Sequence, residues 1–339
     1  MAKKKSAKPA KKPLSPVAAT VAPEPAPTAV LPKKSFASIY PGVPSRPGRD
    51  ETEISPRLVA CVERLEKKLK LPVWLLVQNE LVEEQELGKD TPHMIGNVIA
   101  AAFFSARHSM LKKNEKIALL IDSNGGLANS AYELAMLLRR HCGGFVSVIP
   151  RHAKSAATLL SLGADQIIMN DHAELGPLDV QVWDADREEM LSGLDEVQAL
   201  EQLNTFAMGA FDKMMFLLLR RTKKKSKSIM PLVAEFVARL AEPMFEKIDV
   251  VRYTQMSRAL KIAEEYAKRL LVNTYGDSAA EISRILIENY PEHGFPIYPS
   301  EIRGIGLKLA PLDDELRSTL EEITLNLSGI TCVGRIQST

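Results

Sequence analysis

The sequence has few of the features that mark secreted, metal-binding or membrane-spanning proteins. Its 339 residues include only 3 cysteines, which are far apart and form no CxxC pair (Cys61, Cys142 and Cys332). This spacing argues against a disulfide framework and a cysteine zinc site, and it favours a reducing, cytoplasmic location. The longest apolar runs, around residues 95–104 and 214–219, are far shorter than the roughly 20 residues of a membrane-spanning helix. We therefore expect no metal and no transmembrane segment.

Excess charge and nucleotide-binding motifs are also missing. The 44 basic and 42 acidic residues give a net charge of +2, so the chain as a whole has no strong attraction for nucleic acid. Neither GxGxxG nor GxxxxGK[ST] occurs, so a nucleotide phosphate site is not favoured and we expect no cofactor. The basic N-terminus lacks an apolar h-region, and we expect no signal peptide.

Residues 1–50 are rich in lysine, alanine and proline. Such a segment buries too little apolar surface to offset its ordering entropy, which predicts a disordered tail. Its first twelve residues include no acid and a cluster of lysines: Lys3, Lys4, Lys5, Lys8, Lys11 and Lys12. Two interpretations stay open, a solvated linker and a segment that contacts an acidic partner.

Residues 55–312 are predicted to form one α/β domain. Short apolar runs typical of buried strands, "KIALLID", "FVSVIP" and "QIIM", alternate with the helical patterns "LANSAYELAMLLRRH" and "KSAATLLSLGA". This alternation predicts right-handed crossovers and a parallel sheet. Residues 183–250 are predicted to be a helical insertion, serving as a lid or an assembly surface. Residues 313–339 are predicted to be a helix followed by a frayed tail.

Two turns at the same edge of this sheet carry residues suited to acyl transfer. Gly125 and Gly126 follow one strand, and their backbone N–H groups are suited to hold an oxyanion. The alternative is that the two glycines serve only to give the turn its backbone conformation. Ser155 begins the next helix, where it is either a nucleophile or an N-cap. Because parallel strands place their sites at their carboxyl ends, both turns are expected to converge.

A third turn, "NDHAELGPLDVQV", contains His172 and Asp179. Both side chains are candidates to reach the ends of the strands, where the other two turns converge. The alternatives are a surface loop residue for His172 and a helix cap for Asp179.

Three segments together resemble the serine dehydrogenase proteinase family, which is related to ClpP and signal peptide peptidases within the ClpP/crotonase superfamily. They are "IDSNGGLANSAYELAMLL", "VIPRHAKSAATLLSLGADQIIMNDHAELGPLDVQV" and "YPEHGFPIYPSEIRGIGLKL", in the family's order and at similar spacing. The match covers roughly residues 70–310 and diverges in 183–250. The resemblance implies a ClpP/crotonase-like α/β fold of stacked ββα units. It also implies a homo-oligomeric serine peptidase acting on polypeptides.

The resemblance also implies roles for particular residues. It assigns the nucleophile to Ser155 and places the amides of Gly125 and Gly126 near the oxyanion. The family's Ser, Asp, His order is met by Ser155, Asp179 and His293, the assignment that we favour.

Other assignments of the base stay open. His172 with Asp165 or Asp171 also meets the order, and Lys154 would be the base of a Ser–Lys dyad such as the signal peptide peptidases use. The sequence departs from the family at Asn124, Lys154 and Ala157, where the family has proline, methionine and glycine. These departures keep two alternatives to a peptidase open: a catalytically inactive scaffold or interaction protein, and an acyl-CoA enzyme of the crotonase type.

Overall fold

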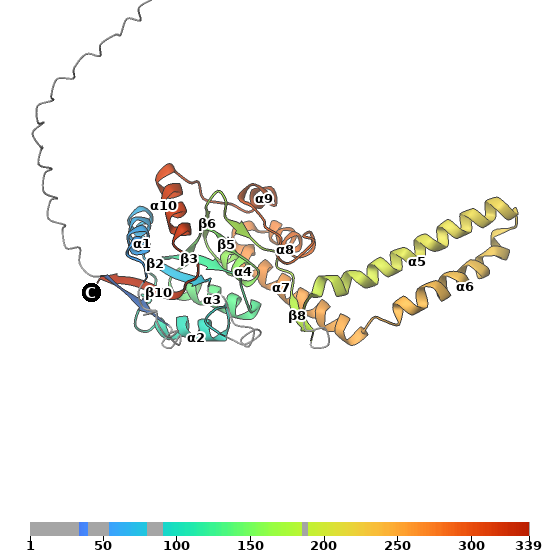
Figure 1. The fold of residues 1–339 in the computed structure, drawn as a ribbon, viewed down its shortest axis with the longest axis horizontal. Coiled ribbons are helices and arrows are strands. Elements are labelled where there is room, and N and C mark those ends of the chain that lie inside the picture. Colours follow the sequence, from blue (N-terminus) through green and yellow to red (C-terminus); the bar gives the residue numbers. More distant parts are fainter. Residues whose placement is uncertain (1–33, 40–53, 80–90, 185–188, 339) are drawn as a thin grey trace, which may run out of the picture. The chain divides into compact units, whose positions relative to one another are not determined.

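The main sheet combines strands from both ends of the described chain (Figure 1). The computed structural model describes residues 34–39, 54–79, 91–184 and 189–338, all within one unit, Lys34–Thr339. The central strand order is β1-β10-β2-β3-β4-β6. Their bounds are β1 Lys34–Ser38, β10 Thr331–Ser338, β2 Val73–Gln78, β3 Ile117–Ser123, β4 Phe145–Ile149 and β6 Gln166–Met169.

The middle of the sheet is parallel, as the sequence predicts. β2 pairs with β3, β3 with β4 and β4 with β6, all in parallel register. Every residue of β2, β3 and β4 is buried, which explains their continuous apolar runs. Two short strands, β5 (His152–Ala153) and β7 (Glu174–Leu175), extend the sheet beyond the carboxyl end of β3. The predicted α/β class is confirmed.

Helices cover both faces of the sheet, and alternate residues of β3 point to the two sides. Leu119 belongs to the larger core and Leu120 to the smaller one. The larger core includes residues of α2 (Asn97–Ala106), α3 (Ala128–His141), α4 (Ala156–Leu162), α7 (Val250–Tyr275), α8 (Ser278–Glu288) and α9 (Pro299–Gly304). The smaller core includes residues of α1 (Pro56–Leu69) and α10 (Asp314–Leu325).

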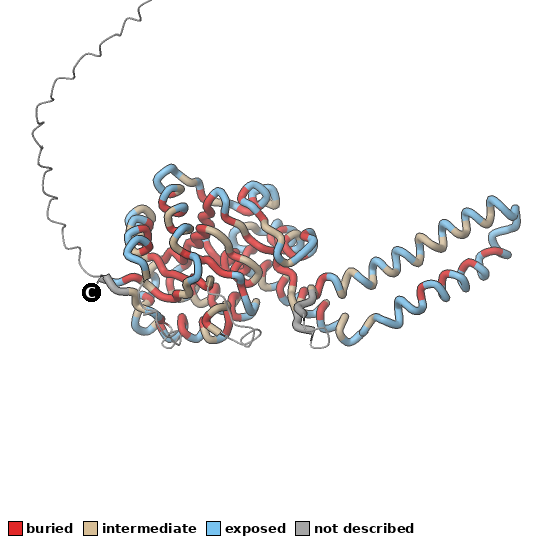
Figure 2. The backbone as a smooth tube through the Cα atoms, viewed as in Figure 1, coloured by how far each residue is buried: buried red, intermediate tan, exposed pale blue. Residues whose placement is uncertain are grey.

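The segment predicted as a helical insertion contains a two-helix hairpin. It begins with the strand pair β8 (Gln181–Asp184) and β9 (Glu189–Ser192), followed by α5 (Gly193–Thr222) and α6 (Ser226–Phe245). The two helices enclose a small apolar cluster of their own, separate from the cores around the sheet. In Figure 2 buried positions recur along α6 toward α5, while much of the rest of the hairpin is exposed.

Both chain ends differ from their predicted tails. β1 lies inside the segment predicted as a disordered tail, and residues 1–33 and 40–50 of that segment lie outside the described residues. The predicted C-terminal tail is β10, which pairs antiparallel with both β1 and β2. α10 packs into the same core as α1, so the predicted boundary at residue 312 does not separate two units. These pairings join residues hundreds of positions apart, and no local pattern reveals them.

None of the helices in the described part of the chain has both the length and the apolar character needed to cross a bilayer.

Candidate active site

Ser155 is held in a backbone conformation that serine rarely adopts. Its φ is 50° and its ψ is −118°, at the turn that leads from β5 into α4. The amide of Ala157 donates to the carbonyl oxygen of Lys154 at 2.8 Å, which closes a turn with Ser155 at a position that favours glycine. Such a conformation costs about 1–3 kcal/mol and persists only where the surroundings enforce it. In the α/β-hydrolases, a similarly strained turn from a strand into a helix exposes the nucleophilic serine.

Helix capping does not account for this serine. Ser155 occupies the N-cap position of α4, but its side chain accepts no capping hydrogen bond. Ser55 provides the contrast, because its hydroxyl at the start of α1 accepts from the amide of Leu58 at 3.1 Å. The hydroxyl of Ser155 is therefore not committed to its helix.

Gly125 lies directly against Ser155. A Cβ atom on Gly125 would lie 2.5 Å from the carbonyl oxygen of Lys154 and 2.9 Å from the Cβ of Ser155. The φ of Gly125 is 103°, a conformation that side chains rarely allow. Close approach and backbone conformation both require glycine here, so the sequence prediction that the two turns converge is confirmed.

The backbone amides beside Ser155 are not equivalent. The amide of Gly125 donates to the hydroxyl of Ser123 at 3.0 Å and is already engaged. The neighbouring amides of Ile95 and Leu127 are also engaged, in bonds of 2.8 and 2.7 Å that join Ile95 to the glycine turn. Within the described residues, no acceptor is recorded for the amides of Gly126 and Ala156, and the latter is the first residue of α4. These two N–H groups are available to a ligand.

Asp179 and His293 form a close pair. The Asp179 Oδ1 atom lies 2.6 Å from the His293 Nδ1 atom, and the side chains are only 4% and 19% exposed. A carboxylate only accepts hydrogen bonds, so Nδ1 carries the proton and Nε2 is left as the basic nitrogen. Burial protects this pair from competition with water.

Ser192 supports the other side of the same carboxylate. Its hydroxyl donates to Asp179 Oδ2 at 3.0 Å and accepts from the amide of Leu194 at 3.1 Å. Ser192 is the N-cap of α5, so the base of the hairpin is bonded directly to the Asp179–His293 pair.

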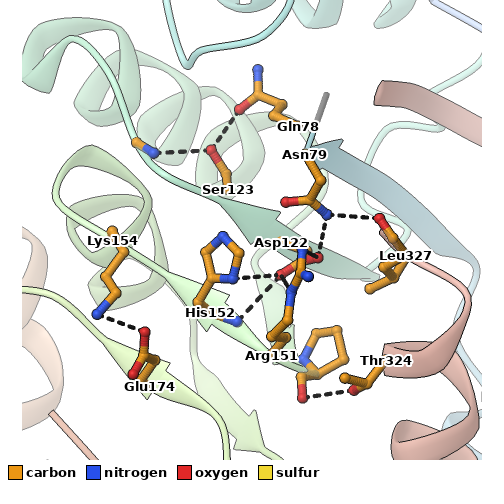
Figure 3. Close-up of polar contacts among 12 residues, drawn as sticks. Gln78, Asn79, Asp122, Ser123, Arg151, His152, Lys154, Glu174, Thr324 and Leu327 are labelled. Atoms are coloured by element: carbon orange, nitrogen blue, oxygen red, sulfur yellow. Dashed lines mark hydrogen bonds and ion pairs between the residues drawn. The ribbon is translucent and has the colours of Figure 1, made fainter. Parts of the chain in front are cut away.

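Lys154 links the Ser155 turn to the His293 loop. Its ammonium group donates to the carbonyl oxygen of Gly294 at 3.2 Å and forms an ion pair with Glu174 at 2.7 Å, shown in Figure 3. The segment that leads to Asp179 also touches the turn, because a Cβ on Gly176 would lie 3.2 Å from the amide nitrogen of Ser155. The three segments therefore adjoin one another, although Ser155 and His293 are not hydrogen-bonded to each other.

The alternative acids and base lie in other surroundings. His172 is exposed in the turn after β6, and its neighbour Asp171 forms an ion pair with Arg317 of α10 at 2.7 Å. Asp165 forms an ion pair with Lys116 at 2.6 Å. The structure thus brings Asp179 and His293 together near Ser155, whereas these residues are engaged or exposed elsewhere.

A buried polar cluster behind the Ser155 turn was missed from the sequence (Figure 3). Asp122 is fully buried, and it accepts from the Arg151 guanidinium at 2.9 Å and from the backbone amide of His152 at 3.2 Å. The side chain of Asn79 and the ring of His152 also contact this carboxylate. The cluster fixes the two residues that lead into the Ser155 turn. Its one sequence signal is an aspartate at the end of the apolar run "KIALLID".

His152 is held in its neutral form by this environment. Burial is the largest effect and lowers its pKa, and the charges of Arg151 and Lys154 act in the same direction. The carboxylates of Asp122 and Glu174 oppose this shift without reversing it. The buried Nε2 atom has no hydrogen-bond partner in the part of the chain that the structure describes. Protonation of this ring is therefore unfavourable in the folded protein.

A second chain of hydrogen bonds supports the glycine turn. The hydroxyl of Ser123 donates to the side-chain oxygen of Gln78 at 2.6 Å, and Gln78 donates to the carbonyl of Pro92 at 2.7 Å. Ser123 in turn accepts from Gly125, so the position of this turn depends on buried polar contacts with β2 (Figure 3).

The described residues contain no group of three His, Cys, Asp or Glu side chains arranged to hold a metal ion.

Comparison with known proteins adds a family match and two relatives. Two proteins of Methanocaldococcus jannaschii, the uncharacterized proteins MJ0137 and MJ1495, are similar to this chain. The first is 27% identical over 212 residues, 62% of this chain and 59% of the relative. The second is 26% identical over 194 residues, 57% of this chain and 51% of the relative. The chain thus matches little more than half the length of these relatives.

The family match covers the centre of the candidate site. The model of the ClpP-like SDH-type serine proteinases matches residues 105–207. This range includes Gly125, Ser155 and Asp179, while His293 lies beyond it. The sheet and its covering helices agree with a ClpP-like α/β fold. Over residues 105–207 the chain is thus similar to the ClpP-like SDH-type serine proteinases, the family that its motifs resemble.

Proposed function

We propose that this protein is a serine peptidase that hydrolyses peptide bonds in polypeptides. The observation that carries the proposal is the strained Ser155, whose hydroxyl caps nothing and whose backbone lies against Gly125. A fold maintains such strain where contacts compensate for it, and it clusters at functional sites. The family match over residues 105–207 supports the reaction class.

The first half of the reaction uses three side chains. The Ser155 oxygen attacks the carbonyl carbon of the substrate while His293 Nε2 takes its proton. Asp179 keeps the proton on Nδ1 and stabilises the imidazolium that forms. His293 then returns the proton to the leaving amine, the C–N bond breaks, and the substrate acyl group remains on Ser155.

The second half repeats these transfers with water. His293 takes a proton from water, whose oxygen attacks the acyl carbon, and the proton then goes to the departing Ser155 oxygen. In both halves the carbonyl oxygen gains negative charge. The amides of Gly126 and Ala156 are the donors that we assign to it, because the amide of Gly125 is already bonded to Ser123. This refines the expectation that both glycine amides serve.

We place the activity in the cytoplasm. Cys61, Cys142 and Cys332 are all free thiols and are buried. Burial raises the pKa of Cys142 to about 11 and that of Cys332 to about 12, so neither is activated as a nucleophile. Unpaired cysteines are typical of a reducing compartment. Because the buried thiols of Cys142 and Cys332 are not activated, Ser155 is the favoured nucleophile.

The experiment compares two serines that occupy helix N-caps. Ser155→Ala and Ser55→Ala are assayed against casein and a mixed peptide library, with Tm measured for both. The expected result is loss of cleavage by Ser155→Ala alone, while Ser55→Ala loses stability through its cap and keeps its activity. Cleavage by purified Ser155→Ala at the wild-type rate would refute the assignment. A wild-type protein that cleaves nothing would favour the scaffold alternative.

A further inference from the structure

The α5–α6 hairpin exposes much of the apolar surface of this protein. More than half of the exposed large apolar side chains in the described residues lie on these two helices. The hairpin's own buried cluster contains only Ile229, Val233 and Val237, packed against partly buried residues of α5. A pair of helices with so small a core is marginally stable alone, because helices in proteins depend on packing of their apolar faces.

The exposed residues of α6 form a continuous stripe. Leu232, Phe236, Leu240 and Met244 follow one another at intervals of four residues and are 64%, 49%, 41% and 42% exposed. This spacing places them along one face of the helix. Val233 and Val237 are buried on the neighbouring face toward α5. α6 therefore has two apolar rows, and the hairpin covers only one.

A groove lies beside the middle of this stripe. Leu240 of α6 lines it together with Phe206, Gly209 and Ala210 of α5. Polar and charged side chains of α5 complete the lining: Gln198, Glu201, Gln202, Thr205 and Lys213. Nothing lies within 4 Å of a Cβ atom built on Gly209, so the floor of the groove is open to an incoming side chain. Small residues between large ones suit knobs-into-holes packing of a further helix.

Charge is separated along the hairpin. The tip carries exposed basic residues: Arg220, Arg221, Lys223, Lys224, Lys225 and Lys227. The base carries exposed acids: Asp195, Glu201, Glu242, Glu246 and Asp249. Lys247 is an exposed basic residue among these acids. The two ends of one hairpin are thus complementary to each other.

We propose that the hairpin binds the hairpin of a second copy of this chain in antiparallel orientation. The stripe is symmetric about Ala238, so a two-fold axis there places Leu232 opposite Met244 and Phe236 opposite Leu240 of the other copy. The same rotation brings the basic tip of each hairpin onto the acidic base of the other. The product is a four-helix bundle that covers both stripes. This proposal does not depend on the chemistry of Ser155.

The charge pattern favours a second copy over a lipid surface. An interfacial helix carries its basic residues along its whole length, opposite the apolar face. Here the largest group of basic residues lies at the tip. Beside the stripe, Arg239 is paired with Glu235, and Glu242 is a further acid. Acids along the stripe would be repelled by anionic lipid.

The first test measures the mass of the full-length protein by light scattering after size exclusion at micromolar concentration. We expect a dimer or a larger even-numbered species for the wild type, and at least about a 10-fold rise in the dissociation constant for Phe236→Asp/Leu240→Asp. Leu325→Asp is the matched control, since Leu325 is an 82% exposed apolar residue on α10. It should associate like the wild type. Circular dichroism verifies that all variants keep their helices.

The second test uses charge reversal to establish the orientation. Lys223→Glu/Lys224→Glu/Lys225→Glu reverses the tip, and Glu242→Lys/Glu246→Lys reverses the base. Each variant alone should associate more weakly than the wild type, and an equimolar mixture should restore the dimer. Association of the wild type should weaken with added salt, because tip and base attract each other.

Three outcomes would overturn the proposal. One is a monomeric wild type at micromolar concentration, and another is an unchanged mass for Phe236→Asp/Leu240→Asp. The third is a monomer that binds phosphatidylserine vesicles and loses this binding when the tip is reversed, which would assign the hairpin to a membrane surface.

Discussion

His293 Nδ1 lies 2.6 Å from Asp179 Oδ1, although the two residues are 114 positions apart in the chain. The bond joins the loop before α9 to the turn that follows β7, and it leaves His293 Nε2 as the basic nitrogen. Ser192 holds the second oxygen of Asp179 at 3.0 Å, so both oxygens of this carboxylate are engaged.

Asp179→Asn is expected to lower kcat by roughly 10³-fold or more, because the amide no longer stabilises the imidazolium or fixes the tautomer of His293. KM should change little, since Asp179 does not face the substrate in the proposed reaction. Steady-state kinetics on a peptide substrate measures both constants. Ser192→Ala is expected to lower kcat less, by about 10-fold, because Ser192 only holds the second oxygen of Asp179. Equal activity of Asp179→Asn and wild type would contradict the role of Asp179.

Gly125→Ala is expected to destabilise the protein and abolish its activity. The added methyl would lie 2.5 Å from the Lys154 carbonyl oxygen and 2.9 Å from the Ser155 Cβ, at a φ of 103°. The backbone strain alone costs about 1–3 kcal/mol. Chemical denaturation and the peptide assay report the two effects. Gly304→Ala is the control, because nothing lies within 4 Å of a Cβ at that position, and it should behave like the wild type.

Lys154 is expected to position the His293 loop and not to act as the base. Its ammonium group is already engaged by Glu174 at 2.7 Å and by the Gly294 carbonyl at 3.2 Å. Lys154→Met removes both contacts but introduces the residue that the family has at this position. We therefore expect kcat to fall by only about 10-fold, with an unchanged shape of the pH–rate profile. His293→Ala should lose activity. Retained activity in His293→Ala, with none in Lys154→Met, would instead identify a Ser–Lys dyad.

Stability is expected to fall in mildly acidic solution because of His152. Burial lowers the pKa of this ring in the folded state, so the unfolded chain binds the proton more readily. Its contribution is complete above the unfolded pKa, about 6.5, and is lost as the pH falls from there toward the folded pKa. The limiting slope is about 1.4 kcal/mol per pH unit for one proton. Urea denaturation at pH values between the folded and unfolded pKa of His152 measures the free energy of unfolding. This free energy should depend less steeply on pH in His152→Gln than in the wild type.

The local parts of the fold were predictable from the sequence. The runs that form β3, β4 and β6 are apolar because helices cover both faces of the sheet, and this shows in a single stretch of sequence. The turn glycines and Ser155 were recognisable because they lie directly between a strand and a helix. β1 and β10 were not recognisable, since each is stabilised by a strand from the other end of the chain.

The candidate site also has parts that the sequence predicts and parts that only the fold shows. Both His172 and His293 met the family's chain order, and the sequence favoured His293 with Asp179 only through the family's motifs. The fold shows that the His293 ring lies against Asp179. It also could not reveal that the Gly125 amide is taken by Ser123, because that bond depends on the register between β2 and β3. Asp122 went unnoticed because its partners, Arg151 and His152, come from another strand end.

The most direct test of the account is covalent labelling of Ser155. Purified full-length protein is treated with a fluorophosphonate, and the adduct is located by mass spectrometry, with circular dichroism to verify folding. We expect one adduct on Ser155, none in Ser155→Ala, and labelling slowed by roughly 10³-fold in His293→Ala. A folded wild-type protein that carries no adduct on Ser155, or that is labelled equally fast in His293→Ala, would contradict it.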